Sequence, residues 1–245
     1  TVTRDDVRAR YAWGDAAEAR TVVLHAGNMG AKQGLEHVIE AARMAGRARI
    51  AQAAAQPEAP ELLFVLMGDG SARHALEAMT HRYGLDNVRF LPLQPHDMLP
   101  NIFAAADVLL VNQRGSVRDM ALPSKLTAYM AAGRPIVAAV ADDSETAREL
   151  NWSSGGIVAA PDDPRALLAA IDRVTRDPGL QAHLSNAARE WSDAVLSEAN
   201  ALRSYEQLVA SILRSSGRGR VHAPGRQPRP VARTPQARGN ERWAA

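Results

Sequence analysis

The sequence predicts an α/β fold, a doubly wound parallel sheet of the Rossmann-like kind. Three observations support this class. Short apolar runs rich in Val, Ile and Leu alternate with segments of helical periodicity. Glycine, proline or a capping residue stands at most of the boundaries between an apolar run and a helical segment. The distance between successive apolar runs leaves room for one helix. Such alternation forms βαβ units with right-handed crossovers and parallel strands.

Short apolar runs define the six expected strands. They combine high β-propensity with lengths too short for helices, and the first run ends near Gly27 and Gly30. The expected strands are residues 21–25, 62–67, 88–91, 107–111, 135–140 and 156–159.

Helical periodicity accounts for the segments between these runs. Leu35, Val38 and Ala42 recur at helical spacing and predict a helix from residue 33. Asp163 and Pro164 predict a helix start, because a capping residue precedes proline at the first helical position. The other helices are expected over residues 71–83, with Ser71 as the cap, over 97–106, 124–132 and 144–150, and in two pieces over 180–213.

Composition narrows the classes of function. The chain has no cysteine, which excludes disulfides, Cys-ligated zinc and thiol nucleophiles. No apolar run approaches the roughly 20 residues that span a bilayer, and no signal peptide is visible at Thr1, so a cytoplasmic protein is expected. No cluster of His, Asp and Glu has the spacing of a metal site, and we expect no bound metal or organic cofactor.

Charge divides the chain into a body and a tail. The net charge is +2, yet residues 214–245 contain eight Arg and one acid, which leaves −5 for residues 1–213. An Arg/Pro-rich stretch of this kind buries too little apolar surface to fold, so a disordered tail is expected. We therefore expect an interdomain-type lead-in segment at 1–19, a Rossmann-like domain at 20–213 and a tail at 214–245. The acidic body disfavours a nucleic-acid partner.

The first candidate site follows the first strand. Only two of the 29 basic residues are lysines, and both precede expected helices. Glycines let a ligand approach the backbone, and a helix N-terminus attracts anions, so this loop is a candidate cradle for a diphosphate. The alternative is a tight turn from strand to helix. The loop residues are Gly27, Asn28, Met29, Gly30, Lys32 and Gln33.

The second candidate site contains the other lysine. Lys125 follows Asp119, Pro123 and Ser124, and Ser124 is expected to cap the next helix. A helix N-terminus that carries Ser and Lys is a second possible anion site. The alternative is an ordinary capped helix with an exposed lysine.

Two further features have structural explanations. Gly68, Asp69 and Gly70 are expected to form a turn, and His25, at a strand end, is expected to be packed and hydrogen-bonded rather than catalytic. No pair of carboxylates stands out as a general acid and base.

Five sequence blocks, taken in order, resemble a known family. They are HAGNMGAKQGLEHVIEAA, LLFVLMGDG, NVRFLPLQP, AADVLLVNQ and LPSKLTAYMAAGRPIVAA. In this order and spacing they resemble the C-terminal domain of family-4 glycosyltransferases of the GT-B fold, and most of all the branch of colanic-acid-type exopolysaccharide transferases. The resemblance covers roughly residues 5–213. Each block alone is unspecific, whereas their order is specific.

The resemblance implies a GT-B architecture with two Rossmann-like domains, of which this chain is the donor-binding half without the acceptor-binding domain. It implies transfer of a sugar from a nucleotide-diphosphate donor, with retention of configuration and without a metal ion, in the synthesis of cell-surface polysaccharide or glycoconjugate. The resemblance further implies that the donor's own phosphate takes the acceptor proton, and that basic side chains and a helix N-terminus stabilise the departing diphosphate.

The resemblance also assigns residues by position. The loop from Gly27 to Gln33 would face the diphosphate. Asp119, Pro123, Ser124 and Lys125 would lie by the sugar and the diphosphate, and Leu93 and Gln94 would lie by the base. The expected partners are a nucleotide-sugar donor, an acceptor-binding domain or partner chain, and an anionic surface at the inner membrane face, contacted through the tail.

Three departures from the family pattern keep a second hypothesis open. Many relatives have Arg where Asn28 stands, and their phosphate lysine stands where Gln33 is found here. Most have two Glu eight residues apart, the second of which holds the ribose, at approximately the positions of Met120 and Ala128. Asp119 is a candidate replacement for the first Glu, and no residue replaces the second. The second hypothesis is a non-catalytic, degenerate GT-B module whose basic tail binds an anionic partner or membrane surface.

Two other enzyme classes fit less well. A dinucleotide-dependent enzyme needs a G-x-G-x-x-G loop after the first strand, and the glycines at 27 and 30 lack that spacing. A sugar-nucleotide epimerase of GT-B architecture needs acid and base carboxylates that the sequence does not show.

Overall fold

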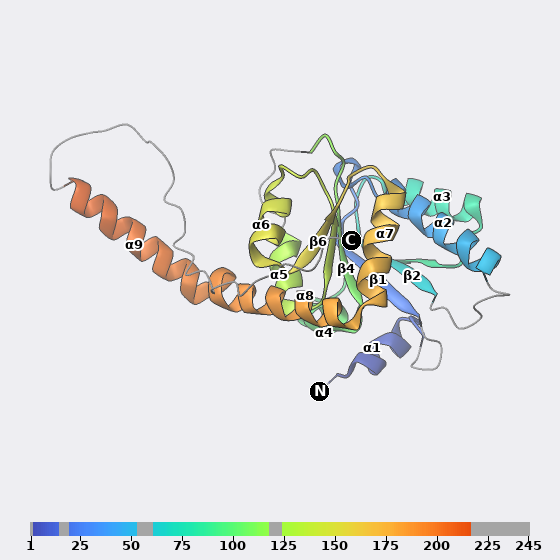
Figure 1. Ribbon diagram of the computed structural model, residues 1–245, viewed down its shortest axis with the longest axis horizontal. Coiled ribbons are helices and arrows are strands. Elements are labelled where there is room, and N and C mark those ends of the chain that lie inside the picture. Colours follow the sequence, from blue (N-terminus) through green and yellow to red (C-terminus); the bar gives the residue numbers. More distant parts are fainter. Residues whose placement is uncertain (1, 15–19, 53–60, 118–123, 217–245) are drawn as a thin grey trace. The chain divides into compact units, whose positions relative to one another are not determined.

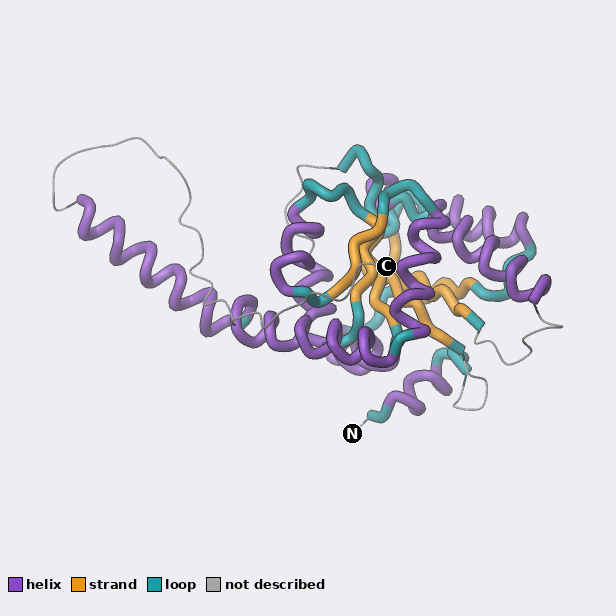
Figure 2. Tube along the Cα trace, in the orientation of Figure 1, coloured by secondary structure: helices purple, strands orange, loops and turns teal. Residues whose placement is uncertain are grey.

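The computed structural model describes residues 2–14, 20–52, 61–117 and 124–216. These residues contain a parallel sheet in the order β3-β2-β1-β4-β5-β6, so the chain winds outward from β1 first in one direction and then, from β4, in the other (Figures 1 and 2). The expected doubly wound parallel sheet is confirmed. The strands are β1 (Thr21–Asn28), β2 (Leu62–Asp69), β3 (Val88–Leu91), β4 (Val108–Asn112), β5 (Ile136–Ala139) and β6 (Gly156–Ala159).

Helices cover both faces of the sheet (Figure 1). Successive side chains of β1 point to opposite faces, so Val22 and Leu24 join one buried cluster and Val23 joins the other. Burial on both faces explains why the strands are continuous apolar runs. The first cluster is covered by α1 (Arg4–Arg10), α4 (Leu99–Ala105), α5 (Ser124–Ala132) and α6 (Glu145–Ser153), and the second by α2 (Glu36–Gln52), α3 (Arg73–Tyr83) and α7 (Pro164–Arg176). Helix α8 (Pro178–Trp191) contributes to both clusters, with Ala188 in the first and Leu184 in the second.

The lead-in segment contains α1, a helix that the sequence analysis did not predict. Thr3 and Asp6 form a reciprocal capping box at its start. Arg8 is buried, donates to the Ala105 carbonyl and forms an ion pair with Asp107 at 2.5 Å. These contacts hold the segment against the amino-end edge of the sheet, near the start of β4.

Strand β1 is longer than expected. It pairs with β2 as far as Gly27 opposite Gly68 and Asn28 opposite Asp69, so Gly27 and Asn28 belong to the strand rather than to the loop after it. The pairing needs glycine, because an ideal Cβ at Gly68 would lie 1.8 Å from the Gly27 carbonyl oxygen. Gly68 and Asp69 are likewise part of β2, and the expected turn begins only at their end.

Three helix starts also differ from the prediction. The helix expected from residue 97 is α4, which begins at Leu99 after the 3-10 turn at His96–Met98. The helix expected from residue 33 begins at Glu36, because a short 3-10 turn, η1 (Ala31–Gln33), comes first and Gly34 adopts a positive φ of 57°. Ser71 does not cap α3, whose N-cap is Ala72 without a side-chain hydrogen bond. By contrast, Asp163 caps α7 through the N–H groups of Arg165 and Ala166 as expected.

The remaining described elements are η2 (His96–Met98), the π-helical turn η3 (Ser192–Leu196) and α9 (Glu198–Ser216). The two helical pieces expected over 180–213 are α8 and α9, and α9 continues three residues past that boundary. The tail expected to be disordered lies outside the described residues from position 217 onward. Within the described part of the chain, no helix has both the length and the apolar character needed to cross a membrane.

Candidate functional site

The candidate site begins where β1 and β4 separate. The order in which the chain adds strands to the sheet reverses between β1 and β4. These two strands pair only at Val23 with Val108 and at Leu24 with Leu109. Beyond that point β1 continues beside β2, and β4 continues beside β5. In doubly wound sheets, ligands bind at the carboxyl ends of the strands at this point of reversal.

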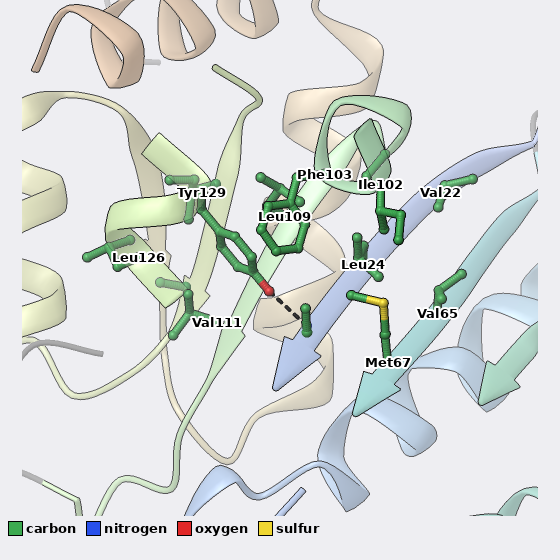
Figure 3. Packing of buried hydrophobic residues seen from close by; sticks show 14 of the residues in the cluster. Val22, Leu24, Val65, Met67, Ile102, Phe103, Leu109, Val111, Leu126 and Tyr129 are labelled. Atoms are coloured by element: carbon green, nitrogen blue, oxygen red, sulfur yellow. Dashed lines mark hydrogen bonds between the residues drawn. The ribbon is translucent and has the colours of Figure 1, made fainter. Parts of the chain in front are cut away.

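Helix α5 supplies the groups that occupy this separation. The Tyr129 ring reaches from α5 toward β1, and its hydroxyl accepts a hydrogen bond of 2.8 Å from the Ala26 N–H (dashed line in Figure 3). The ring packs edge to face on Phe103, with 5.2 Å between ring centroids. Burial raises the pKa of Tyr129. The phenol is therefore a neutral partner for a backbone group that β4 does not reach.

One turn earlier in α5, Lys125 meets His25. The Lys125 Nζ lies 3.3 Å from Nε2 of His25, a residue with no exposed surface. Burial and the neighbouring Lys125 hold the pKa of His25 well below its ordinary value, so the imidazole is neutral. Burial also lowers the pKa of Lys125, to about 8. The sequence analysis expected a packed, hydrogen-bonded His25, and the structure adds its partner.

The two predicted loops meet through Lys125 and Gly27. An ideal Cβ at Gly27 would lie 3.5 Å from Cε and 3.6 Å from Nζ of Lys125, so the lysine side chain lies against the end of β1. Gly27 has a φ of 121°, which disfavours any other residue. The backbone of the first loop and the cation of the second therefore lie side by side.

Neither lysine has an acidic partner in the described part of the chain. Among the described residues, no carboxylate lies within ion-pair distance of Lys32 or Lys125, whereas Arg8, Arg73 and Arg114 all have acidic partners. A largely buried ammonium without a counter-charge is costly unless an anion comes to it. The arrangement around Lys125 is therefore suited to bind an anion.

Residues at the end of β4 hold the first loop in place through hydrogen bonds to its backbone carbonyls. The Asn112 side-chain amide donates to the carbonyls of Gln33 at 2.7 Å and Gly34 at 3.0 Å. Arg114 donates its backbone N–H to the Lys32 carbonyl at 3.0 Å and its Nε to the Ala31 carbonyl at 2.8 Å. Four consecutive carbonyls are thus engaged, and the turn that carries Lys32 is fixed to β4.

Arg114 also forms an ion pair with Glu36 at the start of α2. The sequence analysis named neither Asn112 nor Arg114. The available signal was a polar residue at the end of an otherwise apolar strand, since Asn112 is only 1% exposed.

The structure separates the predicted loop residues into different environments. Lys32 is exposed, and Asn28 lies beside Gly30, whose ideal Cβ would come within 3.3 Å of the Asn28 side chain. Met29 is fully buried in the second cluster, its N–H donates to Asp69, and its carbonyl accepts from Ala72. Met29 therefore supports the loop from the core and does not present a group to a ligand.

Gln33 and the remaining predicted residues are placed as follows. Oε1 of Gln33 is buried without a hydrogen-bond partner. Leu93, after β3, is 68% exposed, and Gln94 accepts a hydrogen bond of 2.8 Å from the Tyr11 hydroxyl. Ser124, expected as the cap of the helix, is instead the exposed first residue of α5, so it lies inside the helix rather than at the cap position. Asp119 and Pro123 lie outside the described residues.

The same part of the chain shows no metal-type cluster. Within residues 2–14, 20–52, 61–117 and 124–216, no three His, Asp or Glu side chains come together in an arrangement that could hold a metal ion.

Sequence comparison places these features in a family. Residues 13–191 match the family described as Glycosyl transferases group 1. The chain is 34% identical over 192 residues to WcaI of Escherichia coli (strain K12), a glycosyl transferase assigned to colanic acid biosynthesis. That alignment covers 78% of this chain and 43% of WcaI, so the chain spans less than half the length of this relative.

Structural comparison agrees on the fold. Alr3699/HepE of Anabaena, solved in complex with UDP and glucose, superposes with a TM-score of 0.66 at 18% identity, over 86% of this chain and 52% of that protein. The C-terminal domain of LpcC, a group 1 family protein of Francisella tularensis, superposes with a TM-score of 0.61 at 14% identity, over 81% of this chain and 95% of that domain. These likenesses confirm the fold class, one half of a GT-B architecture.

Proposed function

The chain belongs to the group 1 glycosyltransferases, and from this premise we propose that it is the donor-binding half of a family-4 enzyme. In this proposal the crevice between β1 and β4 binds a nucleotide-diphosphate sugar. The acceptor is bound by a further domain or partner chain. The near-complete coverage of the LpcC C-terminal domain and the partial coverage of WcaI support this division.

One observation carries the proposal. Lys125 lies at the strand-reversal point, against the backbone of Gly27, without an acidic partner among the described residues. A diphosphate in the crevice provides the missing counter-charge. Gly27, Asn28, Gly30, Lys32 and Gln33, with Asp119, Pro123, Ser124 and Lys125, form the proposed site for the diphosphate and the sugar.

The proposed chemistry is electrostatic. As the bond between sugar and diphosphate breaks, negative charge grows on the diphosphate, and Lys125 and Lys32 stabilise that charge. This role requires no metal ion from the protein. Retention of configuration, with the donor phosphate taking the acceptor proton, is part of the proposal and agrees with the lack of a candidate base in the sequence.

The base-binding edge is proposed at Leu93 and Gln94. The exposed Leu93 offers an apolar surface for a planar base, and the hydrogen bond from Tyr11 orients Gln94. The UDP bound to Alr3699/HepE makes a uridine nucleotide the first to test. The likeness to WcaI, a colanic acid biosynthesis glycosyl transferase by name, supports the proposed role in cell-surface polysaccharide synthesis. The location that we propose for this role is the cytoplasmic side of the membrane.

The test is a binding panel. UDP, GDP, ADP, NAD and the matching monophosphates are titrated by calorimetry and thermal shift against the wild type, Lys32→Ala and Lys125→Ala. We expect one nucleoside diphosphate to bind best, with affinity lost about tenfold or more in each variant, as for removal of a charged hydrogen bond. Arg173→Ala is the matched control, because Arg173 is an exposed cation in the last turn of α7 and should leave binding unchanged.

One observation favours the second candidate, a degenerate binding module. Ala128, exposed on α5 one turn after Lys125, stands where most relatives have the Glu that holds the ribose. No nucleotide binding at millimolar ligand would support this candidate. The chain would then be tested on phosphatidylglycerol vesicles with and without residues 217–245, which contain seven Arg and one acid.

A further inference from the structure

We propose that His25 is a positioning residue for Lys125: its neutral imidazole accepts a hydrogen bond from the ammonium through Nε2 and directs the other ammonium hydrogens toward a ligand beside Gly27. The observation behind the proposal is the 3.3 Å contact between Nζ and Nε2 in a fully buried place. The inference rests on the proposed donor site and adds a residue that does not itself touch the donor.

The chemistry of the two groups decides which of them donates the hydrogen bond. An ammonium has three donors and no acceptor, so the proposal requires an unprotonated Nε2 and a ring proton on Nδ1 of His25. The Asn28 carbonyl oxygen, 3.5 Å from Nε2, is a competing acceptor for a proton on that nitrogen, and the 3.3 Å contact with Lys125 is the shorter of the two. Nδ1 of His25 is buried and has no hydrogen-bond partner among the residues that the structure describes. The backbone of Asn28 and of Leu110 favours a charged ring, but burial and Lys125 disfavour it by more. His25 therefore remains an acceptor at neutral pH.

The surroundings of Lys125 leave the imidazole as its main polar partner. From β1 it faces His25 and the backbone of Gly27, and one turn along α5 stands the neutral Tyr129. No carboxylate of the described residues forms an ion pair with Lys125. Asp119 lies outside the described residues, so Asp119→Asn is included as a background in which the effect of His25 must persist.

A consequence is that Lys125 takes up a proton when the donor binds. Burial lowers the pKa of Lys125 to about 8, so about half of the lysine is neutral at that pH and most of it is neutral at higher pH. A bound diphosphate favours the ammonium and raises the pKa again. Loss of the His25 acceptor disfavours the ammonium and lowers the pKa further.

The chain has only two lysines, which makes the test direct. Protein carrying ¹³C-labelled lysine gives two Cε signals, and Lys32→Arg assigns them. We expect the Lys125 signal to titrate about one pH unit lower in His25→Leu than in the wild type, in line with the loss of a hydrogen bond to a charged group. In His25→Gln the side-chain oxygen can still accept, so the titration should stay near the wild-type value. The Lys32 signal is the internal control and should not move.

UDP addition provides the second measurement. It should raise the Lys125 titration in the wild type, and His25→Leu should bind UDP about tenfold more weakly, with His25→Gln in between. Equal Lys125 titrations in the wild type and His25→Leu would overturn the inference. If His25→Leu does not fold, ¹⁵N shifts of His25 in the wild type decide, because a proton on Nε2 is incompatible with the proposal. Failure of UDP to bind the wild type would reject the proposed function. The titration of Lys125 would still test the hydrogen bond between His25 and Lys125.

Discussion

His25 and Lys125 are both basic groups taken out of water, and their burial acts on stability as well as on binding. Each has a pKa in the folded protein below its value in the unfolded chain. In such a case the unfolded chain binds the proton more tightly over the interval between the two values. Stability therefore rises with pH across that interval. For His25 the interval lies below pH 6.5, and for Lys125 it lies above about 8.

We predict an acid-sensitive stability that depends on His25. Below pH 6.5 the unfolded chain takes up a proton that folded His25 does not, so the free energy of unfolding should fall by up to about 1.4 kcal/mol per pH unit. Urea unfolding of the wild type and of His25→Gln at pH 7.5, 6.5 and 5.5 measures this. Toward lower pH, the free energy of unfolding should fall more steeply in the wild type than in His25→Gln. His74→Gln, at an exposed site, should follow the wild type, and a pH-independent difference for His25→Gln would contradict the prediction.

Among the elements, β4 has the most influence on the site. Its last residue, Asn112, and Arg114 just beyond it engage the carbonyls of the turn that carries Lys32. The N–H groups of Gln33 and Gly34 are bonded within the turn itself, to the carbonyls of Gly30 and Ala31, and the Lys32 side chain is exposed. The turn is therefore held in place by a neighbouring strand as well as by its own hydrogen bonds.

We predict that Asn112→Asp disrupts this support. The substitution replaces the amide that donates to Gln33 and Gly34 with a carboxylate facing two carbonyl oxygens. Because the site is buried, unfolding should become easier by about 2–4 kcal/mol, and nucleotide binding should weaken with it. Urea unfolding and calorimetry measure the two effects. Asn186→Asp on the exposed face of α8 should change stability by less than about 0.5 kcal/mol. Equal effects in the two variants would show that the Asn112 contacts contribute little.

A second prediction concerns α5 and the separation of β1 from β4. Tyr129→Phe removes the hydroxyl that accepts from the Ala26 N–H and leaves that buried donor unsatisfied. The expected loss of stability is about 1–3 kcal/mol, with the ring packing retained. Thermal or urea unfolding is the measurement. Tyr205→Phe, a tyrosine 69% exposed on α9, serves as the control and should be neutral. A neutral Tyr129→Phe would mean that the N–H finds another partner.

For the whole molecule, the proposed division of labour predicts binding without efficient transfer. In that proposal the donor site lies in this Rossmann-like domain, and a further domain or partner chain binds the acceptor. Incubation of this chain alone with the preferred nucleotide sugar and candidate acceptors should yield no more product than Lys125→Ala does. Robust transfer by the isolated chain, detected by mass spectrometry of the glycosylated acceptor, would reject this division.

Local sequence was enough to predict the strands, most helices and the two loops with lysines. Strand ends at β3 and β6 and the Asp163 cap were confirmed, because apolar periodicity and capping act within a few residues. The end of β1 was predicted too early, since its pairing with Gly68 lies some 40 residues away in the chain. The start of α2 was also missed, because η1 and the positive φ of Gly34 depend on contacts from β4.

By itself, the sequence determined the doubly wound sheet, the candidate loops and the family resemblance, all of which follow from local patterns and their order. The tertiary structure decided which of those loops meet. It brought Lys125 against Gly27 and His25, and Asn112 against Gln33 and Gly34. It also buried Met29 away from the site. The physical reason is that pairing, burial and the resulting pKa shifts belong to groups far apart in the chain. Only the closed sheet and its helices bring these groups within contact distance.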